Sequence, residues 1–68
     1  MQVRAKQLVA AMKRLGFREV RQKGSHLQLK RANVTVPVPM HAGDLPQGTL
    51  HSILRRAHLT MQDLKEAL

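Results

Sequence analysis

The sequence predicts an α+β fold in which one helix, three antiparallel strands and a second helix follow in that order, with a short helix at the end. Two stretches with apolar residues at every third or fourth position predict the main helices. Between them, short segments of strand character are separated by glycine and interrupted by proline, which is typical of a small antiparallel meander. At 68 residues the chain is predicted to form one domain, residues 1–68, with a modest core.

The first helix is predicted over about residues 4–15. Gly16 follows the last apolar position and supplies a C-terminal stop. Arginines and lysines lie off the apolar stripe, so the helix is expected to be amphipathic with a basic outer face. The stripe consists of Ala5, Leu8, Val9, Met12 and Leu15.

Three segments of strand character follow, at residues 17–22, 26–30 and 34–38. The pair Gly24 and Ser25 suits a two-residue hairpin turn, because glycine takes the positive φ that the first turn position requires. This turn sets the register of the first two strands. The expected pairs are Lys23 with His26, Gln22 with Leu27, Arg21 with Gln28, Val20 with Leu29 and Glu19 with Lys30.

Alternation of side chains then predicts one apolar and one polar face of the sheet. Val20, Leu27 and Leu29 are expected to face the helices, with Gln22 as a misfit on that face. Phe17 falls on the polar side, although at the junction with the helix it could turn inward. The polar face is expected to hold Glu19, Arg21, Lys23, His26, Gln28 and Lys30.

The third strand is expected to pair with the second so that Leu29 meets Val34 and Leu27 meets Val36. Two prolines near its end donate no backbone hydrogen bond. They predict a strand that lies at the edge of the sheet and ends there.

The C-terminal half predicts two helices. Thr49 or Gly48 is the expected N-cap of the first, whose apolar stripe falls between residues 50 and 57. Thr60 and Asp63 resemble a variant capping box that opens a short last helix. That helix is expected to turn Met61, Leu64 and Leu68 toward the core.

The positive charge is concentrated in one half of the chain. Twelve Lys and Arg against four Asp and Glu give a net charge of +8, and residues 1–31 hold nine of the cations with Glu19 as their only acid. Such a concentration of positive charge attracts phosphate backbones, anionic membranes or an acidic protein. The alternative is a basic surface that contacts only solvent and has no binding role. The chain has no cysteine and no apolar run near the roughly 20 residues of a membrane span, so a soluble cytoplasmic protein without a membrane partner is expected.

His26 is the candidate for acid–base chemistry. In the expected register it lies opposite Lys23, so that an imidazole which exchanges protons near neutral pH would stand beside a cation that holds a phosphate. Those roles suit cleavage of an RNA phosphodiester. The spacing alone favours an exposed strand histidine without function. Ser25 lacks the partners of a nucleophilic serine, although its hydroxyl or the Gly24 amide could contact a phosphate.

Neither a metal nor a cofactor is expected. His41, His51 and His58 form no close ligand pair, and four carboxylates are too few for a two-metal nuclease. Phe17 is the only aromatic residue, which argues against recognition of RNA by stacking. Contacts are expected to come from Arg, Lys, Gln and backbone groups to phosphates and sugars, with strong dependence on salt.

The run GFREVRQKGSHLQLK, followed by VTVPVPMHAGDLPQGTLHSILRRAHLT, resembles the HicA family of bacterial toxin mRNA interferases. Its most specific parts are KGSH and the GTL and IL pattern of the second predicted helix. The resemblance covers nearly the whole chain and implies a fold like that of double-stranded RNA-binding domains. By position it assigns the catalytic histidine to His26 and the glycine two residues earlier to Gly24, while His41 matches a histidine of no assigned role. Family members often carry an aromatic residue where this chain has Leu29.

The resemblance further implies ribonucleolytic inactivation of mRNA, arrest of translation and neutralisation by a HicB-type antitoxin that covers the His26 face. The leading hypothesis is therefore a metal-independent endoribonuclease toxin with His26 as general acid/base. The alternatives are a non-catalytic module that binds double-stranded or structured RNA, and a basic surface that only docks an acidic protein. The cleavage specificity, the product ends, the second proton-transfer group and the antitoxin stoichiometry stay open. The expected RNA and phosphate contacts are Arg21, Lys23, Gly24, Ser25, Gln28 and Lys30.

Overall fold

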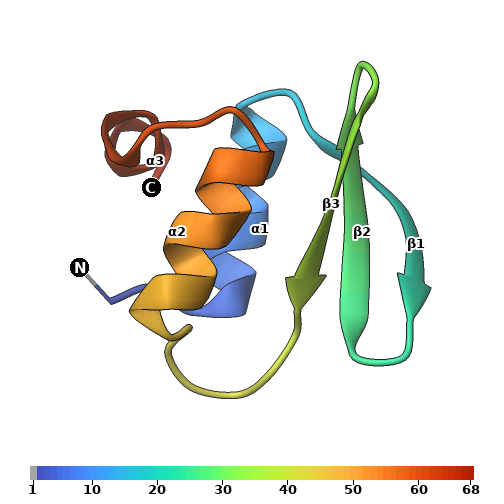
Figure 1. The fold of residues 1–68 in the computed structure, drawn as a ribbon, viewed down its shortest axis with the longest axis horizontal. Helices are drawn as coiled ribbons and strands as arrows, with labels where there is room; N and C mark the ends of the chain where they lie inside the picture. Colours follow the sequence, from blue (N-terminus) through green and yellow to red (C-terminus); the bar gives the residue numbers. More distant parts are fainter. Residues whose placement is uncertain (1) are drawn as a thin grey trace.

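The computed structural model describes residues 2–68 and has the predicted order of elements. Met1, the first residue of the predicted domain, lies outside the described residues. The strands form an antiparallel sheet in the order β1-β2-β3, and the helices lie on one side of it (Figure 1). The α+β class and the α-β-β-β-α order with a C-terminal helix are therefore confirmed. The elements are α1 (Ala5–Arg14), β1 (Arg18–Lys23), β2 (His26–Arg31), β3 (Val34–Pro39), α2 (Gln47–Arg56) and α3 (Met61–Ala67).

The first helix follows the predicted apolar stripe and stops at the predicted glycine. Gly16 has a φ of +101°, a conformation that glycine adopts without a steric penalty. The amide of Phe17 donates to the Met12 carbonyl at 2.9 Å, which reverses the chain at the end of the helix. This reversal turns Phe17 inward, where it is only 3% exposed. The buried residues of the helix are Ala5, Leu8, Val9, Ala11 and Met12.

The β1–β2 hairpin has the predicted turn, but the predicted register holds only next to it. Gly24 has a φ of +60°, as the turn requires. Beyond the turn, a β-bulge at Val20 shifts the pairing by one residue, so the predicted Val20–Leu29 pair is wrong and Val20 is 48% exposed. The observed pairs are Lys23 with His26, Gln22 with Leu27, Arg21 with Gln28, Glu19 with Leu29 and Arg18 with Lys30.

The bulge has a cause in the two residues that fitted the alternation poorly. The turn register places Gln22 on the helix side of the sheet, and the end of α1 turns Phe17 to that side as well. Phe17 and Gln22 are five positions apart in the chain. In a regular strand, two side chains share a face only when an even number of positions separates them. One extra residue in β1 reconciles the two constraints. Burial of the large Phe17 ring thus leaves the smaller Val20 in solvent.

β2 and β3 pair in a register shifted by two residues from the expected one. Leu29 pairs with Val36 and Leu27 with Val38. A two-residue turn between the strands causes the shift, and Ala32 takes a φ of +53° in it. Alanine rarely adopts this conformation, so the turn gives no signal in the sequence. Because the shift is even, each side chain keeps its expected face.

The second main helix begins earlier than expected. Pro46 is its N-cap, so the predicted N-cap at Thr49 or Gly48 is wrong, and both residues lie within the first turn. Proline fixes φ near the value found here, −56°, and the extended ψ of 144° at Pro46 ends the preceding loop.

The last helix opens on the predicted capping box. The Asp63 amide donates to Thr60 Oγ1 at 3.0 Å, and the Thr60 amide donates to Asp63 Oδ2 at 2.9 Å. Leu64 is buried as expected. The expectation for Leu68 is wrong, since its side chain is 48% exposed. The helix ends at Ala67, which takes the inward position instead.

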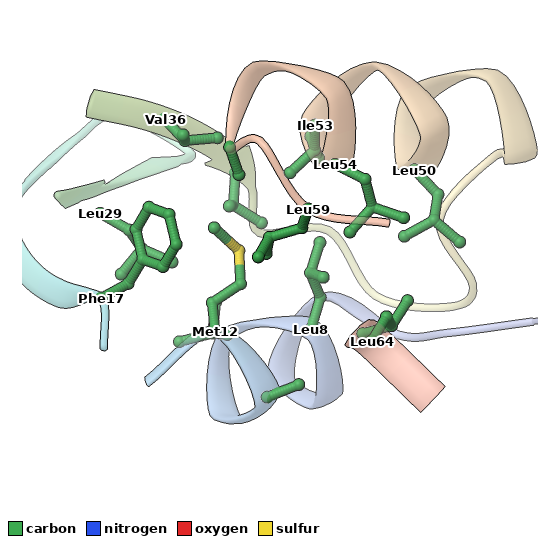
Figure 2. Packing of buried hydrophobic residues seen from close by; sticks show 14 of the residues in the cluster. Leu8, Met12, Phe17, Leu29, Val36, Leu50, Ile53, Leu54, Leu59 and Leu64 are labelled. Atoms are coloured by element: carbon green, nitrogen blue, oxygen red, sulfur yellow. The ribbon is translucent and has the colours of Figure 1, made fainter. Parts of the chain in front are cut away.

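The core lies between the helices and the inner face of the sheet. In Figure 2, Met12 of α1 lies on the side of the core that Leu29 and Val36 of the sheet form, whereas Leu8 points toward apolar residues after and within α2, Leu59 and Leu54. The side chains of Leu8, Met12, Leu29 and Val36 are fully buried. The helices are thus fastened to one face of the sheet only. Among residues 2–68, no helix has the length and apolarity that a membrane crossing requires.

Candidate active site

The face of the sheet turned away from the helices is open and cationic. Leu27 and Leu29 point to the opposite face, where the helices pack. Their neighbours in β2 therefore point outward, and no helix covers them (Figure 1). The cross-strand rows on this open face are Lys23–His26–Pro39, Arg21–Gln28–Pro37 and Arg18–Lys30–Thr35.

His26 is the first residue of β2 and lies directly opposite Lys23, so this predicted pair is confirmed. Cross-strand neighbours have Cβ atoms roughly 4.5–5.5 Å apart, which lets one phosphate contact both side chains. The imidazole is exposed and makes no hydrogen bond within residues 2–68. Both ring nitrogens are therefore free to form hydrogen bonds with a ligand.

Within residues 2–68 the open face carries no carboxylate, contrary to the prediction for Glu19. The bulge turns Glu19 to the helix side, where it forms an ion pair with Lys13 of α1. The cations of the open face have no internal counterion and make no side-chain hydrogen bond in the described part of the chain. An anion that binds there displaces no protein partner. These cations are Arg18, Arg21, Lys23 and Lys30.

The structure divides the predicted site residues between two hollows. The three predicted cations and Gln28 line a shallow hollow on the open face, together with Val20. His26 lines a larger groove of about 700 Å³ between the edge strand β3 and α2. Gly24 and Ser25 form the exposed turn between β1 and β2 and line neither hollow. His26 therefore lies where the open face meets the groove.

The groove contains polar residues that the sequence reasoning did not assign to a site. Thr49, Ser52 and Arg56 of α2 line it, and His41 comes from the loop after β3. None of its lining residues is a carboxylate. The three residues of α2 recur at spacings of three and four, which makes a polar stripe beside the apolar one. That stripe is the signal that could have identified them.

The wall of the groove formed by β3 presents hydrogen-bond acceptors. The Met40 amide donates to the Ser25 carbonyl at 2.7 Å. Because bonded and non-bonded pairs alternate along an antiparallel ladder, the backbone groups of Pro37 and Pro39 point away from β2. Arg56 Nε donates to the outward carbonyl of Thr35 at 3.2 Å, which shows that this edge faces α2. The two prolines remove the amide donors, so their positions offer carbonyl oxygens alone.

Two arginines of the basic half have structural roles instead. Arg31 donates through Nη1 to the Leu15 carbonyl at 2.8 Å and through Nη2 to the Ala57 carbonyl at 3.5 Å. Arg14 Nη1 donates to the Ala67 carbonyl at 2.6 Å. Each guanidinium thus binds carbonyls at helix ends, where the partial charge is negative. The basic character of the chain is therefore divided between internal and ligand-accessible cations.

Three further expectations concern aromatic and metal recognition. Phe17 is buried, so the sole aromatic ring is not available for stacking on a base. Leu29 is fully buried against the helices, so the position where the HicA resemblance suggests an aromatic does not face the open surface. Within residues 2–68 no three His, Cys, Asp or Glu gather closely enough to hold a metal ion.

A comparison with known families gives a match that spans the three strands and both main helices. A family model for the HicA toxin of bacterial toxin–antitoxin systems matches residues 5–59, from the start of α1 to the residues after α2. A search of curated proteins found no match. Because the family match covers well over half of the 68 residues, the chain belongs to the HicA family of bacterial toxins.

Proposed function

We propose that this toxin is a metal-independent endoribonuclease that cleaves mRNA and thereby arrests translation, with His26 as general acid/base. The family supports the role as a toxin. The observation that carries the enzymatic proposal is the exposed, unbonded imidazole of His26 opposite Lys23, on a face without a carboxylate within residues 2–68. Cleavage of a phosphodiester needs a group that moves protons and a cation that stabilises charge on the phosphorus oxygens.

The RNA contacts of this proposal are polar. Lys23, Arg21 and Lys30 hold phosphates, since their side chains have no partner among residues 2–68. Gln28 lies between them on the same face, and the Gly24–Ser25 turn adds backbone groups beside His26. With Phe17 buried, affinity comes from charge, so binding weakens steeply as salt rises.

Membership of a toxin–antitoxin family implies an antitoxin partner. In this proposal the partner is of the HicB type and covers the open face that holds His26. Carboxylates of the antitoxin would meet the unpaired cations, and the exposed Val20 among them offers an apolar anchor. RNA and antitoxin then compete for one surface.

The test is cleavage of a labelled mRNA by the purified toxin in EDTA, with two histidine variants. His26→Ala should cleave at least about 100-fold more slowly than the parent, because general acid–base catalysis typically contributes about 10²- to 10⁴-fold. His51→Ala is the matched control, since His51 is exposed on α2 and lines neither the groove nor the open hollow. A His26→Ala variant that cleaves as fast as this control would show that the assignment is wrong.

A second candidate is a non-catalytic module that binds structured RNA by shape. The observation in its favour is the open cationic face, which contacts phosphates and sugars without stacking. The same assay separates the two functions. This candidate predicts that the parent retains labelled RNA on a filter but leaves it intact at every toxin concentration.

A further inference from the structure

Cleavage of RNA by its own 2′-hydroxyl requires two proton transfers. A base removes the proton from O2′ as the O2′–P bond forms, and an acid gives a proton to O5′ as the P–O5′ bond breaks. The products are a 2′,3′-cyclic phosphate and a 5′-hydroxyl, and no other reactant is consumed. A single imidazole cannot accept one proton and donate another on the opposite side of the phosphorus at the same time, so a second group is needed.

The groove that His26 lines contains one other side chain that can take this role. Among residues 2–68, no carboxylate, cysteine, lysine or tyrosine lines it. A guanidinium such as that of Arg56 is a poor proton-transfer group, and so are hydroxyls such as those of Thr49 and Ser52. His41 is the remaining titratable group. Its imidazole is exposed and has no hydrogen bond within residues 2–68.

The pairing of β2 with β3 places the two histidines near one another. His26 pairs with Pro39, and the bond from the Met40 amide to the Ser25 carbonyl continues the pairing one residue beyond the strand. His41 follows directly and lines the same groove as His26, and extension of this pairing by one more residue puts it at the diagonal position. Diagonal neighbours in an antiparallel pair lie roughly 7–8 Å apart, a separation that long and aromatic side chains can bridge. A phosphodiester fits between two imidazoles at this spacing.

Cations flank His41 on both sides. Arg56 lines the groove that His41 shares with His26. On its other side, His41 lines a second hollow with Arg4 and Lys6 at the start of α1. An RNA strand whose phosphates bind the cations on both sides would pass over His41. The carbonyl of Pro39 points away from β2, so it is available to accept a hydrogen bond from a ribose 2′-hydroxyl, a donor that DNA lacks.

We propose that His41 is the second proton-transfer residue of the toxin, and that His26 and His41 act as an acid–base pair on an RNA phosphodiester bound in the groove between β3 and α2. This inference rests on the ribonuclease function proposed above. It adds a catalytic residue from a loop and moves the reacting phosphate from the open face to the junction of that face with the groove. The cations of the open face then bind the flanking nucleotides.

The first experiment compares His41→Gln with His51→Gln, which removes a histidine of α2 outside the groove. Single-turnover cleavage of RNA by His41→Gln should be at least about 100-fold slower, with RNA binding within about threefold of the parent. The rate of the parent should show a bell-shaped dependence on pH, and His41→Gln should lose one limb of it. Circular dichroism spectra that match the parent show that the exposed loop position leaves the fold intact.

The second experiment assigns the two roles through the leaving group. In an RNA with sulfur in place of O5′ at the cleaved linkage, the thiolate leaves without a proton, so the variant that lacks the acid recovers activity. Of His26→Gln and His41→Gln, one should cleave this substrate within about tenfold of the parent and the other should stay impaired. If neither variant regains activity on this substrate, the two histidines do not act as an acid–base pair.

The outcomes separate this inference from the function on which it rests. If His41→Gln cleaves as fast as His51→Gln with an unchanged pH profile, the role of His41 is wrong while catalysis by His26 stands. If the parent leaves RNA intact, the ribonuclease proposal and the inference fail together.

Discussion

Arg31 is expected to be among the most important cations for stability, although it belongs to the basic half of the chain. Its guanidinium binds the Leu15 and Ala57 carbonyls at the ends of α1 and α2 and lies 4.6 Å from the centre of the Phe17 ring. Its methylene Cδ lies near Gly16, 3.2 Å from where a Cβ would stand. One side chain thus ties the end of β2 to two helices.

The cost of Arg31→Met follows from these contacts. The hydrogen bond from the charged guanidinium to the Leu15 carbonyl contributes about 1.5–3 kcal/mol, and the longer bond to the Ala57 carbonyl adds little. The partly exposed cation–π contact with Phe17 adds about 0.5–1 kcal/mol. Methionine keeps part of the packing of the methylenes. We expect the free energy of unfolding to fall by about 2–4 kcal/mol, a large part of the roughly 3–10 kcal/mol typical of a chain this size.

Thermal unfolding followed by circular dichroism measures this effect. A loss of about 2–4 kcal/mol, at about 4–8 °C per kcal/mol in a small domain, lowers the Tm by roughly 8–32 °C. Arg18→Met is the matched control, because Arg18 is an exposed cation of the open face and its side chain has no partner in the described part of the chain. Its free energy of unfolding should change by less than about 0.5 kcal/mol. A Tm for Arg31→Met within about 3 °C of this control would refute the structural role of Arg31.

Three further predictions test the open face, the bulge and the last helix. Lys23→Gln should weaken RNA binding and reduce the slope of log K against log salt by about 0.7 for single-stranded RNA, and an unchanged slope would argue against a phosphate contact. Val20→Thr should leave the free energy of unfolding within about 0.5 kcal/mol of the parent in urea titrations, because the bulge exposes Val20; a loss well above 1 kcal/mol would instead indicate the buried register. Thr60→Ala should cost about 0.5–2 kcal/mol of stability by removing the cap of α3, and Thr60→Ser should restore most of it; equal stability of all three proteins would contradict the capping box.

Much of the candidate site could be predicted because it depends on one turn. Gly24 at a positive φ sets the pairs nearest to it, and these include His26 opposite Lys23. The groove could not be predicted in this way. It forms only when β3, the loop with His41 and the polar stripe of α2 meet, and those segments are distant in the sequence.

The sequence by itself determined the features that neighbouring residues control: the apolar stripe of α1, its stop at Gly16, the Gly24 turn and the Thr60–Asp63 cap. Each depends on backbone preferences or hydrogen bonds within a few residues.

Only the tertiary structure decided the strand register and the environment of His26. The alternation of apolar and polar residues shows which face of the sheet a side chain occupies. A shift of β3 along β2 by two residues leaves every side chain on the same face, so this alternation could not show whether Val34 or Val36 lies opposite Leu29. Burial of Phe17 required the bulge, and the bulge removed Glu19 from the open face and placed Val20 there. The free energy of burying the whole core governs these choices, and no local segment contains that information.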